Sequence, residues 1–271
     1  MVSQEQRRRQ LAREKFLRQQ QRRTAARRKA RTRNSVIASV LGVVVIGGAA
    51  LWTTGALKSD SGKKDDKAAA SPSAKSKAPD PCAKPAAGSV KKLSWKKEPA
   101  MTIATSAQYT MKLATTCGDI DVALKAAAAP HTVNSFDFLA GQGFFDHSKC
   151  HRLTTNGIYV LQCGDPTGTG TGGPGYTIPD ENLKDKSLKG NVYPAGTVAM
   201  ANTGQAHTGG SQFFLVYQDS QLPPSYTPFG TISASGMQVL KKIAAAGENT
   251  GAGDGAPNAT VVINKAAVTK S

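Results

Sequence analysis

The sequence predicts a mainly β fold, a closed antiparallel barrel of eight strands capped by two helices, within residues 101–271. Short apolar runs that alternate with polar residues recur through this region, and Gly, Pro, Asn and Asp separate them. This period of two is typical of strands with one buried face. Two further segments carry apolar residues at helical spacing. About 170 residues are enough for one core of this kind.

Three segments precede this region, and the first is a basic tail, residues 1–34. The chain has a formal net charge of +17, and this tail carries 13 Lys and Arg against 2 acidic residues. Residues 101–271 carry 11 of each sign and are neutral. The positive charge therefore does not predict a nucleic-acid partner for the folded region. We expect the tail to lie in the cytoplasm, where contact with anionic lipid headgroups is an open alternative.

The second segment, residues 35–57, is expected to be a transmembrane helix. Its 22 residues from Val36 to Leu57 contain no charged side chain. At about 1.5 Å per residue they reach roughly 33 Å, which is enough to cross a hydrocarbon core of about 30 Å. Arg31 and Arg33 precede it, and the positive-inside rule then predicts a single-pass protein of the cell membrane with a cytoplasmic N-terminus. A cleaved signal peptide is the alternative.

The third segment, residues 58–100, is expected to be a disordered stalk. It consists mainly of Lys, Ala, Ser and Pro and has few apolar side chains. Such a composition does not bury enough apolar surface to offset the conformational entropy lost on folding. We therefore expect the stalk to carry the folded domain outside the cytoplasm.

The folded region is expected to begin with a β-hairpin. Apolar residues occupy every second position in YTMKL, from Tyr109 to Leu113, and in IDVAL, from Ile120 to Leu124, and TTCGD supplies a turn between them. A helix follows in PHTVNSFDFLAGQG, with Pro130 near its start. Further strands are expected at KCHRLTT, IYVLQCGD, GTVAMAN, SQFFLVY and FGTI, then the second helix at SGMQVLKKIAAAG and a last strand at ATVVINKAAV.

Gln212 raises a separate question, because this long amide directly precedes the apolar run Phe213 to Tyr217. Burying an unpartnered polar group costs about 1–3 kcal/mol. The side chain is therefore expected either to be hydrogen-bonded inside the domain or to face a cleft and bind a ligand there.

Five motifs in this order resemble the cyclophilin family of peptidyl-prolyl cis/trans isomerases. They are His-Arg in CHRL, Gln-x-Gly-Asp in LQCGD with a glycine-rich loop after it, Met-Ala-Asn in AMAN, Gly-Ser-Gln-Phe-Phe in GGSQFF, and Phe-Gly in PFGTI. The resemblance covers residues 109–270, and the whole layout is similar to the membrane-anchored cyclophilins of high-GC Gram-positive bacteria. It implies a cyclophilin-like isomerase that needs no cofactor and acts on proline-containing polypeptides folding outside the cytoplasm.

The resemblance also implies roles for individual residues. Arg152 matches the catalytic arginine, which stabilises the twisted X-Pro amide without transferring a proton. Gln162 matches the glutamine that orients this arginine, and Asn202 and Gln212 match groups that hold the substrate backbone. The proline pocket is expected at Tyr159, Val160, Phe214, Leu222 and Tyr226, with Ala201 and Thr203 as further substrate-binding residues. The segment between Arg152 and Gln162 is two residues longer than the common family pattern.

Two other functions fit parts of the sequence. A peptide-binding chaperone or scaffold would use the same groove with little isomerase turnover. Alternatively, the basic tail is the functional part and the barrel is incidental. The run GTGTGGPG, from Gly168 to Gly175, lacks the Gly-Lys-Ser/Thr ending of a phosphate-binding loop and is expected to be a surface loop beside the groove.

The four cysteines favour disulfide bonds, because an even count is typical of proteins outside the cytoplasm. Cys150 and Cys163 are expected on neighbouring antiparallel strands, which favours a bond between them, and Cys82 would then join Cys117; other pairings stay open. His147, Cys150, His151 and Cys163 are ligand types that suit zinc. Their spacing is unusual and adjacent strand residues point to opposite faces, so no metal is expected.

Overall fold

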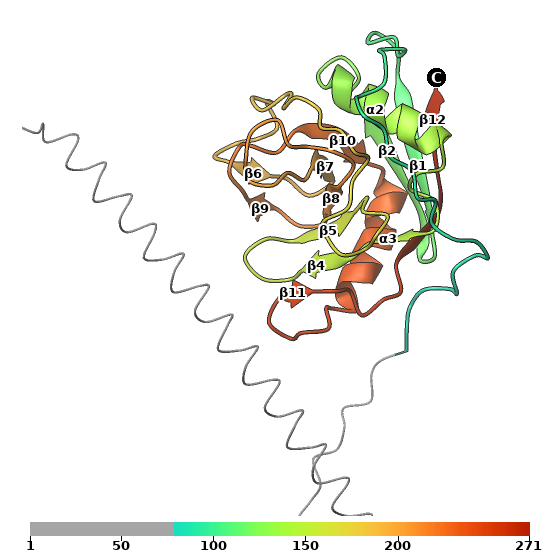
Figure 1. Cartoon of the computed structure of the whole chain (residues 1–271). Coiled ribbons are helices and arrows are strands. Elements are labelled where there is room, and N and C mark those ends of the chain that lie inside the picture. Colours follow the sequence, from blue (N-terminus) through green and yellow to red (C-terminus); the bar gives the residue numbers. More distant parts are fainter. Residues whose placement is uncertain (1–78) are drawn as a thin grey trace, which may run out of the picture. The chain divides into compact units, whose positions relative to one another are not determined.

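A computed structural model describes residues 79–271 of the chain, which form the coloured part of Figure 1. The basic tail, the transmembrane helix predicted over 35–57 and the stalk up to residue 78 lie outside the described residues. Within residues 79–271, none of the helices has the length and apolar character needed to span a bilayer. The tail and the anchor stay predictions from the sequence.

The predicted hairpin consists of β1 (Tyr109–Thr115) and β2 (Gly118–Leu124). Every second residue of β1 is buried, as the alternation predicts. The free edge of β1 pairs with the last strand, β12 (Val262–Lys270), from Tyr109 opposite Lys270 to Thr115 opposite Ile263. The C-terminal strand of the domain therefore lies beside its first hairpin (Figure 1).

The main sheet has ten strands in the order β11-β4-β5-β8-β7-β10-β2-β1-β12-β3, and all neighbours are antiparallel. Its other members are β3 (Ser148–Lys149), β4 (Arg152–Thr154), β5 (Val160–Cys163), β7 (Thr197–Met200), β8 (Phe213–Val216), β10 (Pro228–Ile232) and β11 (Asp254–Gly255). A separate pair consists of β6 (Val192–Tyr193) and β9 (Ser220–Gln221).

The prediction of a closed eight-stranded barrel is wrong, because the ten-stranded sheet is an open half-barrel. Its two edge strands, β11 and β3, do not pair with each other. The physical reason lies at Cys150 and His151, where the chain changes partner: the Cys150 N–H donates to Val261 O (2.9 Å), and the His151 N–H donates to Gln162 O (3.1 Å). The chain thus stops pairing beside β12 and starts pairing with β5, and no row of hydrogen bonds joins the two edges of the sheet.

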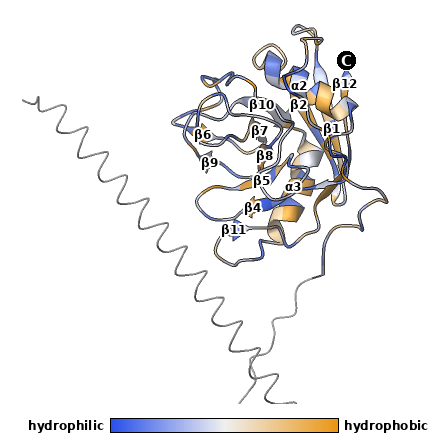
Figure 2. Ribbon diagram, viewed as in Figure 1, coloured by the Kyte–Doolittle hydropathy of each residue, from blue (hydrophilic) through white to orange (hydrophobic). Residues whose placement is uncertain are grey.

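The two predicted helices are present as α2 (Pro130–Gly141) and α3 (Ala234–Ala245). The side chain of Ser233 accepts a hydrogen bond from the Gly236 N–H (3.0 Å) and caps the start of α3. Hydrophobic and hydrophilic segments follow one another along α3 in Figure 2, which fits a helix with one buried face. Phe136 of α2 is completely buried and lies 4.6 Å from the ring of Phe229 and 5.5 Å from that of Phe213, centroid to centroid.

Residues 80–102, here called the strap, are ordered against the domain, so the predicted disordered stalk is wrong for this part. The Ala83 N–H donates to Thr116 O (2.8 Å), and the Trp95 N–H donates to Pro174 O (2.8 Å). The Trp95 ring packs edge-on against Phe138 at a centroid distance of 5.0 Å. The composition of the strap did not predict this order, because the strap has no hydrophobic core of its own. Backbone hydrogen bonds, one aromatic ring and a disulfide hold it against the rest of the domain.

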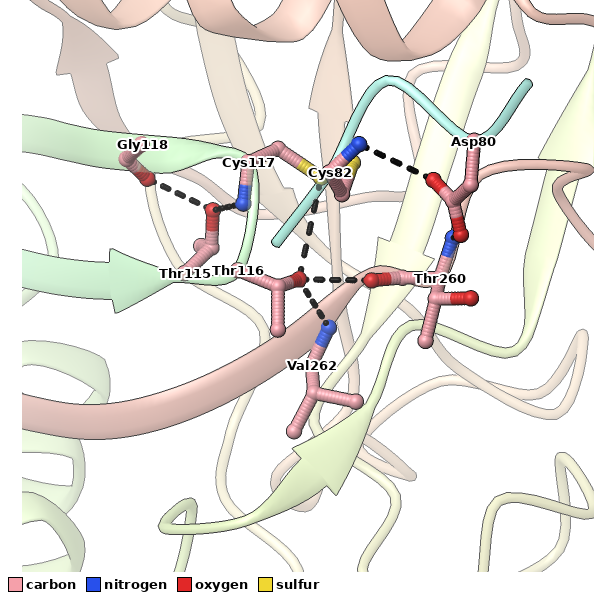
Figure 3. The surroundings of a disulfide bond; sticks show 8 residues. All are labelled: Asp80, Cys82, Thr115, Thr116, Cys117, Gly118, Thr260 and Val262. Carbon is pink, nitrogen blue, oxygen red and sulfur yellow. Dashed lines mark hydrogen bonds between the residues drawn. A yellow bond between two sulfur atoms is a disulfide. The ribbon is translucent and has the colours of Figure 1, made fainter. Parts of the chain in front are cut away.

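Both disulfides that the sequence favours are present, Cys82–Cys117 and Cys150–Cys163. The first joins the strap to the turn of the β1–β2 hairpin (Figure 3). Around it, Asp80 accepts the Cys82 and Thr260 N–H groups (both 2.9 Å), and Thr116 Oγ1 donates to Thr260 O (2.6 Å). The start of the strap is thereby tied to both the first hairpin and the segment that leads into β12.

Candidate active site

Strand register places the central polar side chains of the site in one row. Arg152 on β4 lies opposite Gln162 on β5, and Gln162 lies opposite Phe214 on β8. Residues that pair directly across neighbouring strands point to the same face of a sheet. A cation, an amide and an aromatic ring therefore stand side by side on one face, although they lie far apart in the sequence.

The guanidinium of Arg152 is held by two side chains. Its Nε donates to Asp254 Oδ1 (2.7 Å) and its Nη2 to Asp254 Oδ2 (2.9 Å), while Nη1 donates to Gln162 Oε1 (3.1 Å). The hydrogen bond to Asp254 raises the pKa of Arg152 despite partial burial, and the same bond lowers the pKa of Asp254. Both groups are therefore charged at neutral pH, and this two-pronged contact fixes the plane of the guanidinium.

A chain of amides continues from Arg152 across the sheet. Gln162 Nε2 donates to Gln212 Oε1 (2.9 Å), and Gln212 Nε2 donates to Gly172 O (2.9 Å). The half-buried amide of Gln212 is thus hydrogen-bonded, which confirms the first expectation, and it also lines a cavity. That it binds a ligand there stays a prediction. Because each amide is oriented by the next, the row presents fixed donors and acceptors before a ligand arrives.

A cavity of about 530 Å³ opens beside Arg152, and part of its wall is apolar. Val160, Phe214 and Leu222 are at most 9% exposed and belong to one cluster. Tyr226 packs edge-on against Phe214 at a ring centroid distance of 5.4 Å. Beneath them, the buried Tyr193 hydroxyl donates to Tyr226 O (2.8 Å), and burial raises the pKa of Tyr193 to about 12. The wall is consequently both apolar and held in place.

Most of the predicted site residues meet at this cavity. It is lined by Arg152, Val160, Gln162, Ala201, Asn202, Phe214, Leu222 and Tyr226. A second cavity of about 1050 Å³ adjoins it and shares Gln162, Gly170, Ala201 and Asn202 with it. The two remaining polar residues, Thr203 and Gln212, line this second cavity. The cavities therefore form one continuous groove with an apolar part and a polar part.

Tyr159 is the one predicted residue that lies outside the groove. Its ring packs edge-on against Tyr217 at a centroid distance of 5.9 Å, and its N–H donates to Ser220 Oγ (2.9 Å). Ile158 lines the cavity in its place. The two additional residues between Arg152 and Gln162 moved the alignment by one position, and a shift of one residue turns a side chain to the opposite face.

Ile158→Ala is therefore expected to lower kcat/KM for an Ala-Pro peptide, whereas Tyr159→Ala is expected to leave it unchanged. The substitution removes three carbons, and each one that contacts the proline ring is worth about 0.8 kcal/mol, or about fourfold in rate. The rates would be measured by exchange NMR on both variants, with urea unfolding to separate lost stability from lost activity. If Tyr159→Ala alone lost rate, Tyr159 and not Ile158 would belong to the proline pocket.

Two residues of the site were missed by sequence reasoning, Asp254 and Ile158. Asp254 comes from β11, which pairs with β4 through Asp254 and Thr154. It stands in the sequence Gly-Asp-Gly, 102 residues after Arg152. An acid between two glycines is typical of a turn, so no local signal pointed to it.

The glycine-rich loop from Gly168 to Gly175 is organised by the completely buried Asp165. Its carboxylate accepts hydrogen bonds from the Thr167 N–H (2.7 Å), the Thr169 N–H (3.1 Å) and the Gly170 N–H (2.6 Å). Burial acts against ionisation, but the hydrogen bonds from Thr167 and from backbone groups outweigh it and lower the pKa of Asp165 to about 2. The loop lies beside the groove as predicted, because Gly170 lines both cavities.

This pKa shift predicts an acid-dependent contribution to stability. A carboxyl with a pKa of about 2 in the folded chain and an ordinary value of 3.8 stabilises the fold above pH 3.8, and this contribution is lost as the pH falls through 2. Asp165→Asn should therefore lower the urea midpoint at pH 7, and the difference from wild type should shrink in acid. The control is Asp121→Asn; an equal change of both variants with pH would contradict the prediction.

No group of three or more His, Cys, Asp and Glu side chains in residues 79–271 is placed to hold a metal ion. The alternative of a zinc site also requires free thiolates, but Cys150 and Cys163 are bonded to each other. The nearby His147 and His151 have buried ring nitrogens without hydrogen-bond partners within the described residues.

Together, the fold and the site define a half-barrel with a peptide-sized groove, in which a fixed guanidinium stands beside an apolar cavity. The sequence model of the family described as "Cyclophilin type peptidyl-prolyl cis-trans isomerase/CLD" matches residues 110–268, more than half of the chain. The chain belongs to this family, and the resemblance noted in its motifs is confirmed.

Individual relatives support this assignment. A probable peptidyl-prolyl cis-trans isomerase B of Mycobacterium leprae is 53% identical over 165 residues, which are 58% of this chain and 56% of that protein. The chain thus spans about half the length of the mycobacterial relatives it matches. Peptidyl-prolyl cis-trans isomerase B of Bacillus subtilis is 42% identical over 127 residues, 46% of this chain and 82% of that protein.

The fold also has a counterpart among crystal structures. A cyclophilin type peptidyl-prolyl cis-trans isomerase of Cryptosporidium parvum superposes with a TM-score of 0.51 at 25% sequence identity. The superposition covers 60% of this chain and 99% of that one. The strap lies before the residues that the family's sequence model matches.

Proposed function

We propose that this chain is a peptidyl-prolyl isomerase that accelerates cis/trans rotation of X-Pro bonds in polypeptides outside the cytoplasm. The observation that carries the proposal is the guanidinium of Arg152, held by Asp254 and Gln162 at the edge of an apolar cavity. Family membership and the names of the relatives support the same reaction.

The chemistry of the reaction suits this arrangement. Rotation about the X-Pro amide faces a barrier of about 18–20 kcal/mol, because resonance across the C–N bond must be broken. In the twisted state the prolyl nitrogen regains its lone pair and accepts a hydrogen bond. The apolar wall of Val160, Phe214 and Leu222 holds the proline ring, and Arg152 donates to the nitrogen. Because its pKa is raised, Arg152 keeps its proton throughout.

Fixed orientation is what turns this contact into catalysis. A donor that is already aligned with the charge distribution of the transition state costs no reorganisation when the bond twists. Asp254 and Gln162 engage the Nε, Nη2 and Nη1 atoms of the guanidinium, so its plane does not have to reorient. The amide chain through Gln212 and the polar groups near Asn202 are suited to holding the substrate backbone on either side of the proline.

The experiment that tests the proposal is exchange NMR of the full chain with a short Ala-Pro peptide. Exchange NMR needs no coupling protease, so nicking of the chain does not distort the result. We expect accelerated cis/trans exchange that is blocked by excess of a second proline peptide. Binding without acceleration would overturn the enzymatic proposal and favour the alternative of a peptide-binding chaperone or scaffold.

The extracytoplasmic part of the proposal is supported by the two disulfides, because such bonds form and persist in oxidising compartments. The sequence prediction of a single-pass anchor over 35–57 points the same way. Intact cells would be treated with a membrane-permeant thiol reagent under non-reducing conditions and the chain analysed by mass. We expect no modified cysteine without reductant; modification of all four would place the chain in a reducing compartment.

A further inference from the structure

The strap carries two adjacent lysines, Lys96 and Lys97, to the wall of the second cavity. They are the only cations that line this cavity in the part of the chain that the structure describes, and both are exposed. The remaining wall is uncharged apart from Glu98, and consists of glycine, threonine, serine and amide side chains together with Pro174, Tyr176 and Ala201. The polar end of the groove is therefore positively charged, and that charge comes from residues outside the range that the family's sequence model matches.

Contacts on both sides of the lysines fix their backbone. Before them, the Trp95 N–H donates to Pro174 O (2.8 Å), and its ring lies 5.0 Å from that of Phe138. Gly175 has a φ of 89°, and a Cβ at this position would overlap Ser94 Oγ, so the strap packs directly on the glycine-rich loop. The loop that borders the groove and the strap that carries the lysines are thus docked together.

After the lysines, the strap is fixed to α2. Asn134 Nδ2 donates to Ala100 O (3.0 Å), and Asn134 Oδ1 accepts the Thr102 N–H (2.8 Å). The carboxylate of Glu98 lies 3.3 Å from His131 Nδ1 and is held toward the start of α2. Neither Lys96 nor Lys97 has an acidic partner within 4.0 Å among residues 79–271, so their charges remain available at the groove.

In the first cavity the charges are balanced. Arg152 and Asp254 form an ion pair at 2.7 Å, so this end of the groove offers an apolar wall and a neutralised pair. A peptide with its proline ring in the first cavity extends on one side into the second cavity, because the two share Gln162, Gly170, Ala201 and Asn202. Side chains on that side of the proline meet the lysines.

We propose that Lys96 and Lys97 make this enzyme selective for X-Pro segments that carry an Asp or Glu side chain on one side of the proline. The proposal rests on the proposed function and adds the substrate class. An acidic side chain in the second cavity forms an ion pair with one of the lysines, while a basic side chain at the same position is repelled. The strap thereby acts as a specificity element that lies outside the matched family region.

The test measures catalysed exchange by NMR with the full chain and a set of peptides. A neutral Ala-Pro peptide is compared with versions that carry one Glu or one Lys at each of the three positions before and after proline. For Glu on one side only, we expect a rate enhancement over the neutral peptide of roughly 2- to 10-fold, the size of one or two exposed ion pairs. The enhancement should disappear between about 0.01 M and about 1 M ionic strength, as the Debye length falls from about 30 Å to about 3 Å.

The decisive variant is Lys96→Glu together with Lys97→Glu, which should reverse the preference so that Lys-containing peptides react faster than the neutral one. The matched control is Lys84→Glu together with Lys92→Glu, two exposed strap lysines outside both cavities, with the same change of net charge. The control should keep the preference for Glu. The rate with the neutral peptide should be equal in wild type and in the Lys84 and Lys92 control, and each protein's preference is expressed relative to its own rate with the neutral peptide.

Three outcomes are distinguishable. If the neutral peptide is not isomerised by wild type, the proposed function fails. If it is isomerised but Glu gives no advantage on either side of proline, the selectivity proposal alone fails. If the Lys84 and Lys92 control loses the preference as fully as the Lys96 and Lys97 variant, the effect belongs to net charge and the assignment to the cavity wall is overturned.

Discussion

Replacing Arg152 with alanine is expected to lower kcat/KM for an Ala-Pro peptide by about 10²- to 10³-fold, the loss seen when one preorganised donor to a transition state is removed. Peptide binding should change little, because the apolar wall of the cavity lies in Val160, Phe214 and Leu222. Arg152→Lys should recover only a small part of the activity, since an ammonium does not reproduce the contacts with Asp254 and Gln162.

The measurement combines exchange NMR with a titration of peptide binding for wild type, both Arg152 variants and a control. Lys186→Ala removes an exposed cation that lines neither cavity and should keep the wild-type rate. If Arg152→Ala binds peptide and retains the rate of wild type, Arg152 does not act on the twisted bond. A parallel loss of binding and rate would instead assign it to ground-state binding.

Loss of the two disulfides is expected to have large but different effects. Cys82 and Cys117 are 35 residues apart, and Cys150 and Cys163 are 13 apart. In the chain-entropy picture, removing the first bond lowers the free energy of unfolding by about 4 kcal/mol and removing the second lowers it by about 3 kcal/mol. Double alanine variants of each pair and urea unfolding would measure both values.

The loss of activity should be larger in the variant that loses less stability, the one without the Cys150–Cys163 bond. Cys150 precedes Arg152 by two residues and Cys163 follows Gln162 directly, so their bond joins the strand ends that carry the guanidinium and its partner. Cys150→Ala with Cys163→Ala should reduce the rate with the neutral peptide, while Cys82→Ala with Cys117→Ala should preserve it wherever the chain is folded. Equal rates in both variants under folding conditions would contradict a positioning role of the second bond.

The sequence predicted the elements that have enough length for a periodic pattern. Period-two alternation located β1 and β2, and the spacing of Val133, Phe136 and Leu139 located α2 with all three side chains completely buried. The four short strands β3, β6, β9 and β11 have two residues each, which is too few for any period. Their existence depends on partners distant in the chain.

Local sequence patterns also could not predict whether the sheet closes, because closure too depends on residues distant in the chain. The number of strands does not determine whether the two edges meet, because this depends on pairing between distant residues. At Cys150 and His151 the chain changes from one neighbour to another, which no local pattern reveals. The strap was misjudged because its stability comes from its contacts with the rest of the domain.

For the site, the motifs found eleven residues, and ten of them line the groove. The error at Tyr159 arose between Arg152 and Gln162, where the chain is two residues longer than the common family pattern. Asp254 was missed because its partner, Arg152, is brought to it by the fold alone. The order of the motifs therefore predicted which side chains meet. Only the structure identified Asp254 as the group that orients Arg152.

The bond between Cys82 and Cys117 determines how the domain carries mechanical load. Tension applied from the N-terminal side passes Asp80, which is held by hydrogen bonds alone, and reaches a covalent attachment at Cys82, where the disulfide transmits it directly into the turn between β1 and β2. Residues 83–102 are then bypassed, so their hydrogen bonds are not peeled away one after another. Lys96 and Lys97 consequently stay at the groove under pulling forces that would strip a strap held only by non-covalent contacts.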